Sequence, residues 1–231
     1  TRFNMLYCWR SGSKSMNKKE LAAQTVAELK KIYPDAICSL TYKDPIQLLI
    51  AVRLSAQCTD ARVNMVTPVL FEKYPTLDAL CEASAEDIGE IIKPCGLFNT
   101  KAKDIRNLSL ILRDEYGGRV PDSMEQLLKL PGVGRKTANL ILGDVYGKPA
   151  IVADTHCIRI SGRIGLTDGT KDPVKVEKQL RECVEPSEGN NLCHRFVLFG
   201  RETCTARSPK CGNCPLNDFC LNSLNNEQKQ Q

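Results

Sequence analysis

The hydrophobic pattern is helical along most of the chain. Apolar residues recur three or four positions apart, as they do between Leu21 and Ile32, and this spacing predicts a helix over 18–32. Apolar-polar alternation is confined to a few short branched runs, and no β-hairpin signal accompanies them. We therefore expect an all-α fold of about ten short helices.

Start and stop signals set some of the helix boundaries. An aspartate–proline pair predicts a helix over 45–57 with Asp44 as its N-cap. A longer helix is expected to begin at Asn99 or Thr100 and to end at the glycine pair 117–118. Each boundary is predicted by a residue that can hydrogen-bond the unpaired backbone groups at a helix end or let the chain turn out of the helix.

Composition changes this picture only at the two ends. The 231 residues, 42% of them hydrophobic and 26% charged, form one large or two small globular domains. No apolar run approaches the roughly 18 residues of a membrane span, so no membrane association is expected. Residues 1–15 differ from the rest and are expected to be a leader or expression remnant outside the fold, with Met16 as a natural start. Residues 222–231 are expected to be a polar tail.

Two helices and a very short turn are predicted over 123–147. Pro131 ends the first helix, and two glycines allow a tight reversal with exposed backbone N–H groups at the start of the second. Such a helix–hairpin–helix commonly binds a DNA phosphate, although the turn alone is also compatible with an ordinary αα-hairpin. The expected DNA contacts of this turn are Gly132, Val133, Gly134 and Arg135.

Lys136 occupies the first turn of the second helix, where the helix dipole disfavours a cation. A lysine there either contacts a phosphate or is tuned for chemistry. The dipole and partial burial would both lower its pKa, and an ordinary lysine is only about one part in a thousand neutral near pH 7.4. The neutral amine is the form that attacks carbon, so Lys136 is a candidate nucleophile.

Asp154 follows a short apolar run and precedes a predicted helix. Helix capping would by itself explain an aspartate at this position. It is also a candidate catalytic carboxylate, because it lies eighteen residues after Lys136 and could face the same cleft. His156 and His194 have no partner at metal-binding spacing and are expected to be packed or surface residues.

Four cysteines near the C-terminus have the spacing C-x6-C-x2-C-x5-C, which predicts one metal centre. Structural zinc sites usually use two close cysteine pairs, whereas this segment has one, so the spacing favours an iron–sulfur cluster. The six-residue gap carries Arg207 and Lys210, which are expected to contact DNA phosphates. The candidate ligands are Cys204, Cys211, Cys214 and Cys220.

Four motifs in order resemble those of the endonuclease III family of base-excision DNA glycosylases with AP-lyase activity. They are LLIAVRLSAQCTD at 48–60, GLFNTKAKDI at 96–105, LPGVGRKTAN at 130–139 and VADTH at 152–156, and the cysteine spacing follows them. The resemblance extends from about residue 17 to 221. Cys58 departs from it, since family members commonly have a small residue there, and the HCIRI stretch also differs.

The resemblance implies two all-α domains. One, 38–148, would be a six-helix barrel that contains the helix–hairpin–helix. The other, 16–37 with 149–221, would carry a 4Fe–4S cluster. Double-stranded DNA with a damaged base or an abasic site would lie across the cleft between them, with the damaged nucleotide flipped out.

The resemblance also implies residue roles. Lys136 would attack the anomeric carbon, expel an oxidised or ring-saturated pyrimidine and form a Schiff base, after which β-elimination breaks the strand 3′ to the lesion. Asp154 would assist this chemistry. Gln57 and Leu97 would fill the gap left by the flipped base.

Two alternatives remain from the sequence: an adenine-mismatch glycosylase, whose family usually lacks the lysine, and a non-catalytic iron–sulfur module. For the enzyme, we expect a monomer that works in the bacterial cytosol, associated with the nucleoid.

Overall fold

The computed structural model describes residues 16–223, and every element in this range is helical. The predicted all-α class is therefore confirmed. The expected leader, residues 1–15, and residues 224–231 of the expected tail lie outside this range. Of the tail residues that are described, Ser223 is buried. None of the described helices is long and apolar enough to cross a bilayer.

The chain divides into two compact units. One comprises Cys38–Lys148, and the other joins the N-terminal segment through Ile37 to the segment from Pro149 onward. The elements of the first unit are α2 (Pro45–Leu54), α3 (Asp60–Lys73), α4 (Leu77–Glu82), α5 (Ala85–Ile92), the 3₁₀ turn η1 (Lys93–Cys95), α6 (Phe98–Tyr116), α7 (Met124–Leu127) and α8 (Arg135–Asp144).

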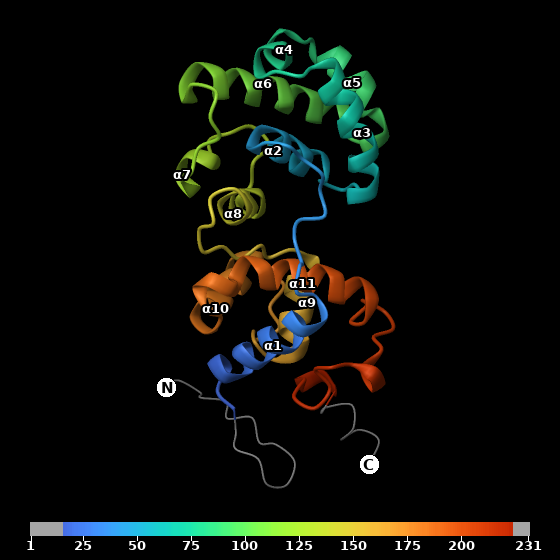
Figure 1. The fold of residues 1–231 in the computed structure, drawn as a ribbon, viewed down its shortest axis with the longest axis vertical. Helices are drawn as coiled ribbons and strands as arrows, with labels where there is room; N and C mark the ends of the chain where they lie inside the picture. Colours follow the sequence, from blue (N-terminus) through green and yellow to red (C-terminus); the bar gives the residue numbers. More distant parts are fainter. Residues whose placement is uncertain (1–15, 224–231) are drawn as a thin grey trace. The chain divides into compact units, whose positions relative to one another are not determined.

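Helix α2 forms the core of this first unit. Leu48, Leu49 and Ile50 have no exposed surface, although they point in different directions around the helix. A helix that is apolar on all sides must be surrounded, and α2 contacts α3, α6 and α8 (Figure 1). It ends at Leu54, three residues before the predicted end, and a turn over the next residues leads to the left-handed Gln57.

Helix α6 covers the other side of the same core. Its apolar face, which includes Ile105, Leu108 and Leu112, is fully buried, and the helix packs against α4 and α5. It starts at Phe98, one or two residues earlier than predicted, because Leu97 takes the N-cap position in a left-handed conformation. It ends at Tyr116 with Gly117 as its left-handed C-cap, as the glycine pair predicted.

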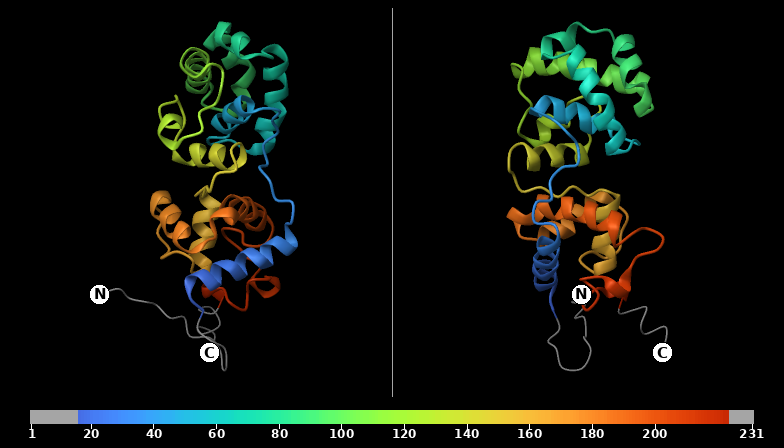
Figure 2. Two further views of the ribbon diagram at one scale, coloured as in Figure 1. Left: turned by 60° about the vertical axis from the view of Figure 1, so that its left-hand side comes forward. Right: turned by 45° about the vertical axis from the view of Figure 1, so that its right-hand side comes forward.

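The second unit is built around α11. Phe196 and Phe199 on this helix are buried, and α11 contacts α1 and α9 (Figure 2). The elements of this unit are α1 (Lys18–Ile32), α9 (Thr155–Ile164), α10 (Pro173–Cys183), the 3₁₀ turn η2 (Pro186–Glu188), α11 (Gly189–Glu202) and the 3₁₀ turn η3 (Cys211–Asn213).

Candidate active site

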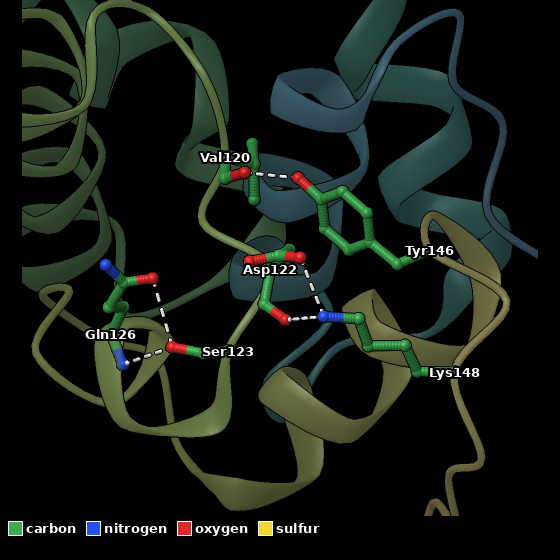
Figure 3. Close-up of polar contacts among 6 residues, drawn as sticks. All are labelled: Val120, Asp122, Ser123, Gln126, Tyr146 and Lys148. Carbon is green, nitrogen blue, oxygen red and sulfur yellow. Dashed lines mark hydrogen bonds and ion pairs between the residues drawn. The ribbon is translucent and has the colours of Figure 1, made fainter.

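Helices α7 and α8 form the predicted hairpin, although α7 is only one turn long. Ser123 caps α7 by accepting a hydrogen bond of 3.3 Å from the Gln126 amide (Figure 3). Val133 is buried under the turn, whereas Gly134 is exposed and serves as the N-cap of α8 without a side-chain cap. A glycine in that position leaves room for an anion close to the first amides of α8.

The two outer ends of the hairpin are tied together. The Tyr146 hydroxyl, which follows α8, donates a hydrogen bond to the carbonyl of Val120, which precedes α7 (Figure 3). The Lys148 ammonium donates to the Asp122 carbonyl and lies 2.7 Å from the Asp122 carboxylate. The hydrogen bond from Lys148 lowers the pKa of Asp122. These contacts close the base of the hairpin.

The turn itself rests on an ion pair. Arg53 of α2 and Asp104 of α6 are joined by contacts of 2.8 Å (Nε–Oδ2) and 2.6 Å (Nη2–Oδ2), and their side chains are only 13% and 21% exposed. Gly132 has φ +69°, and a Cβ there would lie 2.3 Å from Arg53 Nε and 2.8 Å from Asp104 Oδ2. Glycine is therefore required at 132 by both its conformation and its neighbours.

We expect Gly132→Ala to lower the free energy of unfolding by about 3 kcal/mol, since left-handed strain and overpacking each cost about 1–2 kcal/mol. Gly134→Ala is the matched control, because a Cβ there meets nothing within 4 Å. It should cost less than about 1 kcal/mol, the usual penalty for alanine at an N-cap. Denaturant unfolding measures both; equal losses would contradict the role of the ion pair.

Lys136 lies in the first turn of α8, next to this turn. The expected partial burial is wrong: the Lys136 side chain is exposed, because Ala138 and Ile141 occupy the inward face of α8. Any desolvation of its amine must therefore come from a bound ligand. In the described residues, the Lys136 side chain is open to solvent beside the glycine turn of the hairpin.

Asp154 caps α9, as one of its two interpretations predicted. Its Oδ1 accepts a hydrogen bond of 2.7 Å from the Cys157 amide. The preceding run, Ala150 to Ala153, is buried and fixes the backbone at this point. The carboxylate is half-buried and lies at the N-terminal end of α9.

Gln57 and Leu97 share an unusual backbone. Their φ angles are +55° and +50°, and they are the two non-glycine residues with positive φ in residues 16–223. Both side chains are exposed, and Leu97 exposes 59% of its surface. Left-handed conformations cost about 1–3 kcal/mol each and gather at functional sites. No helix or turn signal in the sequence predicts this conformation.

The four cysteines of the C-terminal segment line one cavity, together with Phe199 and Leu216. Within residues 16–223, no three His, Cys, Asp or Glu side chains converge tightly enough to hold a single metal ion. Thiols spread around a cavity suit a 4Fe–4S cluster, in which each cysteine binds a different iron. Burial raises the pKa of Cys214 to about 11, and the other three thiols act in the same direction. Thiolates in this cavity therefore require bound cations.

Two arginines of α9 bind the cluster segment, residues 204–220, which contains the four cysteines. Arg163 donates hydrogen bonds to the carbonyls of Thr205 (2.7 Å) and Ala206 (2.8 Å), and its Nη1 lies 3.4 Å from Cys204 Sγ. Arg159 donates to the Cys204 carbonyl at 3.0 Å. Sequence reasoning missed both, because only folding brings α9 beside this segment.

The cluster segment has its own surface cations. Arg207 and Lys210 are exposed on the loop between Cys204 and Cys211, as expected. Within the loop, the Thr205 hydroxyl donates to the Ser208 carbonyl at 2.7 Å. The two histidines are packed: His156 lies against Gly200, and His194 is buried.

Comparison with known proteins identifies the family. Residues 50–186 match the HhH-GPD superfamily of base excision DNA repair proteins, and 204–220 match the iron–sulfur binding domain of endonuclease III. Endonuclease III of Synechocystis sp. is 45% identical over 208 residues, covering 90% of this chain and 94% of that protein. The Escherichia coli (strain K12) endonuclease III is 40% identical over 206 residues, covering 89% and 96%. The chain belongs to the endonuclease III family.

Solved structures agree with this assignment. A trapped endonuclease III–DNA covalent intermediate superposes with a TM-score of 0.85 at 41% identity, covering 94% of this chain and 100% of that one. A thermostable thymine-DNA glycosylase, with a TM-score of 0.80 at 22% identity, supports the fold alone. As a family member, the chain is a DNA glycosylase with AP lyase activity and contains a 4Fe–4S cluster.

Proposed function

We propose that this enzyme removes oxidised or ring-saturated pyrimidines from double-stranded DNA, using Lys136 as its nucleophile, and that it also cleaves abasic sites. The observation that carries this assignment is the position of Lys136: an exposed amine in the first turn of α8, beside the glycine turn of a helix–hairpin–helix. In this proposal, a phosphate bound at the turn brings the sugar-phosphate backbone to the Lys136 amine.

The Lys136 amine then attacks C1′ of the damaged nucleotide. A C–N bond forms, the glycosidic bond breaks, and its electron pair leaves with the base. Opening of the sugar ring converts the adduct to a Schiff base. The imine acidifies the C2′ hydrogen; loss of that proton breaks the C3′–O bond by β-elimination, and hydrolysis releases the enzyme.

Asp154 assists this chemistry in the proposal. Its carboxylate is anchored by the Cys157 amide at 2.7 Å, so it is oriented before DNA binds. A fixed negative charge stabilises the positive charge that develops on the sugar as the base departs. The same carboxylate can accept a proton from the attacking amine.

Three groups of residues contact the DNA in this proposal. The α8 N-terminus with Gly132, Val133, Gly134 and Arg135 binds one phosphate. Arg207 and Lys210 contact others from the cluster segment. Gln57 and Leu97 fill the space left by the flipped nucleotide, and leucine suits this role because it needs no hydrogen-bond partner.

The 4Fe–4S cluster, held by Cys204, Cys211, Cys214 and Cys220, supplies a rigid cross-link for the cluster loop. None of the steps above needs electron transfer. We further infer that the enzyme works as a monomer in the bacterial cytosol, associated with the nucleoid, since its substrate is the chromosome.

Duplexes with one defined lesion test the proposal. Base release and strand cleavage are scored separately on thymine glycol, 5-hydroxycytosine, 8-oxoguanine and an adenine mismatch. We expect both activities on the two pyrimidine lesions, with a borohydride-trapped adduct that maps to Lys136 by mass spectrometry. Base release confined to the adenine mismatch, or an adduct on another residue, would overturn the assignment.

A further inference from the structure

Lys101 is fully buried, which is unusual for a lysine. It lies in the first turn of α6, where the dipole of its own helix disfavours a cation. Its position matches the apolar face of that helix, four residues before Ile105. An ammonium group in such a place must be stabilised by specific partners elsewhere in the fold.

Those partners are two backbone carbonyls. The Lys101 Nζ donates to the carbonyl of Leu54 at 2.8 Å and to that of Cys95 at 2.9 Å. Leu54 is the last residue of α2, and Cys95 is the last residue of η1. Carbonyls at helix ends have no partner within the helix and carry partial negative charge, so one ammonium caps both elements.

Each capped end leads directly to a left-handed residue. Gln57 follows Leu54 by three residues, and Leu97 follows Cys95 by two. Cys58 follows Gln57 directly, and burial together with the Cys58 thiol raises the pKa of Cys95 to about 11. Lys101 therefore connects the two loops that carry the strained, exposed side chains.

Polar and charged neighbours act on the Lys101 ammonium. Burial lowers the pKa of Lys101, and the Cys58 and Cys95 thiols oppose that shift, whereas Arg53 adds to it. Arg53 in turn belongs to the ion pair beneath Gly132. Arg53 is therefore shared by the ion pair beneath Gly132 and by the electrostatic surroundings of Lys101.

We propose that Lys101 is a positioning residue for lesion recognition: its ammonium holds the Gln57 and Leu97 loops in register, so that both side chains enter the DNA together. The proposal rests on the wedge role given to these two residues under the proposed function. It requires that loss of the ammonium impairs insertion of the wedge more than it impairs DNA contact in general.

The probe is a duplex with a tetrahydrofuran abasic-site analogue opposite 2-aminopurine. The analogue is not cleaved, so the signal does not depend on Lys136. Insertion of the wedge unstacks the 2-aminopurine and raises its fluorescence. The wild-type enzyme should give this rise and Leu97→Ala should lose it. If the wild type gave no rise, or Leu97→Ala kept it, the wedge assignment itself would fail, a result separate from any outcome at Lys101.

Lys101→Met should bind the undamaged duplex with unchanged affinity but give less than half of the fluorescence rise at saturation, with about tenfold weaker binding to the tetrahydrofuran duplex. Lys103→Met is the control, because Lys103 is an exposed lysine on the same helix. It removes the same charge and should behave like the wild type.

A double variant separates positioning from general destabilisation. If Lys101 acts through Leu97, then Lys101→Met adds little to Leu97→Ala, because the wedge is already lost. Multiplicative effects of the two substitutions, or a normal fluorescence rise in a folded Lys101→Met protein, would overturn the proposal. Lys101→Gln, which keeps one donor, is the second variant, with an intermediate loss expected. If neither variant folds, Lys101 serves the fold as a whole and the positioning role is rejected.

Discussion

Lys136→Ala should lower the single-turnover rate of base release by at least about 10³-fold, and should abolish borohydride trapping and strand cleavage. The amine is the only group in the proposed mechanism that forms a bond to the sugar, so no neighbour replaces it. Binding to the uncleaved tetrahydrofuran duplex should weaken by less than about tenfold, because the substitution removes one surface cation out of several near the DNA.

The control for this experiment is Lys129→Ala. Lys129 is also exposed and lies on the same hairpin segment, where it pairs with Glu125 at 3.0 Å. Its loss removes an equal charge and should leave trapping at the wild-type level. A trapped adduct that persists in Lys136→Ala but disappears in a variant of another lysine would move the nucleophile to that residue.

Local signals in the sequence account for the helices and for much of the site. The aspartate caps at Asp44 and Asp172, the glycine stop at Gly117 and the hairpin turn are all determined by residues within a few positions of each other. The spacing of four cysteines within one short segment likewise shows a metal centre without any knowledge of the fold.

Contacts between distant segments were not predictable. Nothing near Gly132 indicates that Arg53 and Asp104 lie beneath it. No local sequence signal indicates the left-handed conformation of Leu97. For Lys101 one signal did exist: it occupies the apolar face of the helix with Ile105, Leu108 and Leu112. A lysine at such a position means either that the predicted helix face is wrong or that the ammonium has buried hydrogen-bond partners.

The exposure of Lys136 has a different explanation. Partial burial was inferred from the need for a neutral amine, but a folded chain does not have to supply that environment before DNA arrives. In the proposed mechanism, an exposed lysine is accessible to its substrate, and the bound DNA then removes water from around it. The free protein therefore shows the position of Lys136 but not the surroundings that its amine would have in a complex with DNA.

Asp154 allows capping and catalysis to be measured separately. Asn is as good an N-cap as Asp, so Asp154→Asn should keep the bond to the Cys157 amide while it removes the charge. We expect a rate of base release about 10²–10³-fold lower, as for the loss of one oriented electrostatic group. The free energy of unfolding should change by less than about 0.5 kcal/mol, since the cap is retained.

Asp154→Ala removes both functions and should combine that rate loss with about 1 kcal/mol of destabilisation. The matched control is Asp172, which caps α10 in the same unit by accepting from Val174 and Lys175. Asp172→Ala should cost a similar free energy of unfolding and leave the rate unchanged. If Asp154→Asn kept the wild-type rate while Asp154→Ala lost it, the aspartate would act through the helix cap alone. A loss of rate in both variants with stability retained in Asp154→Asn requires a charge that acts on the sugar, because the cap is then intact.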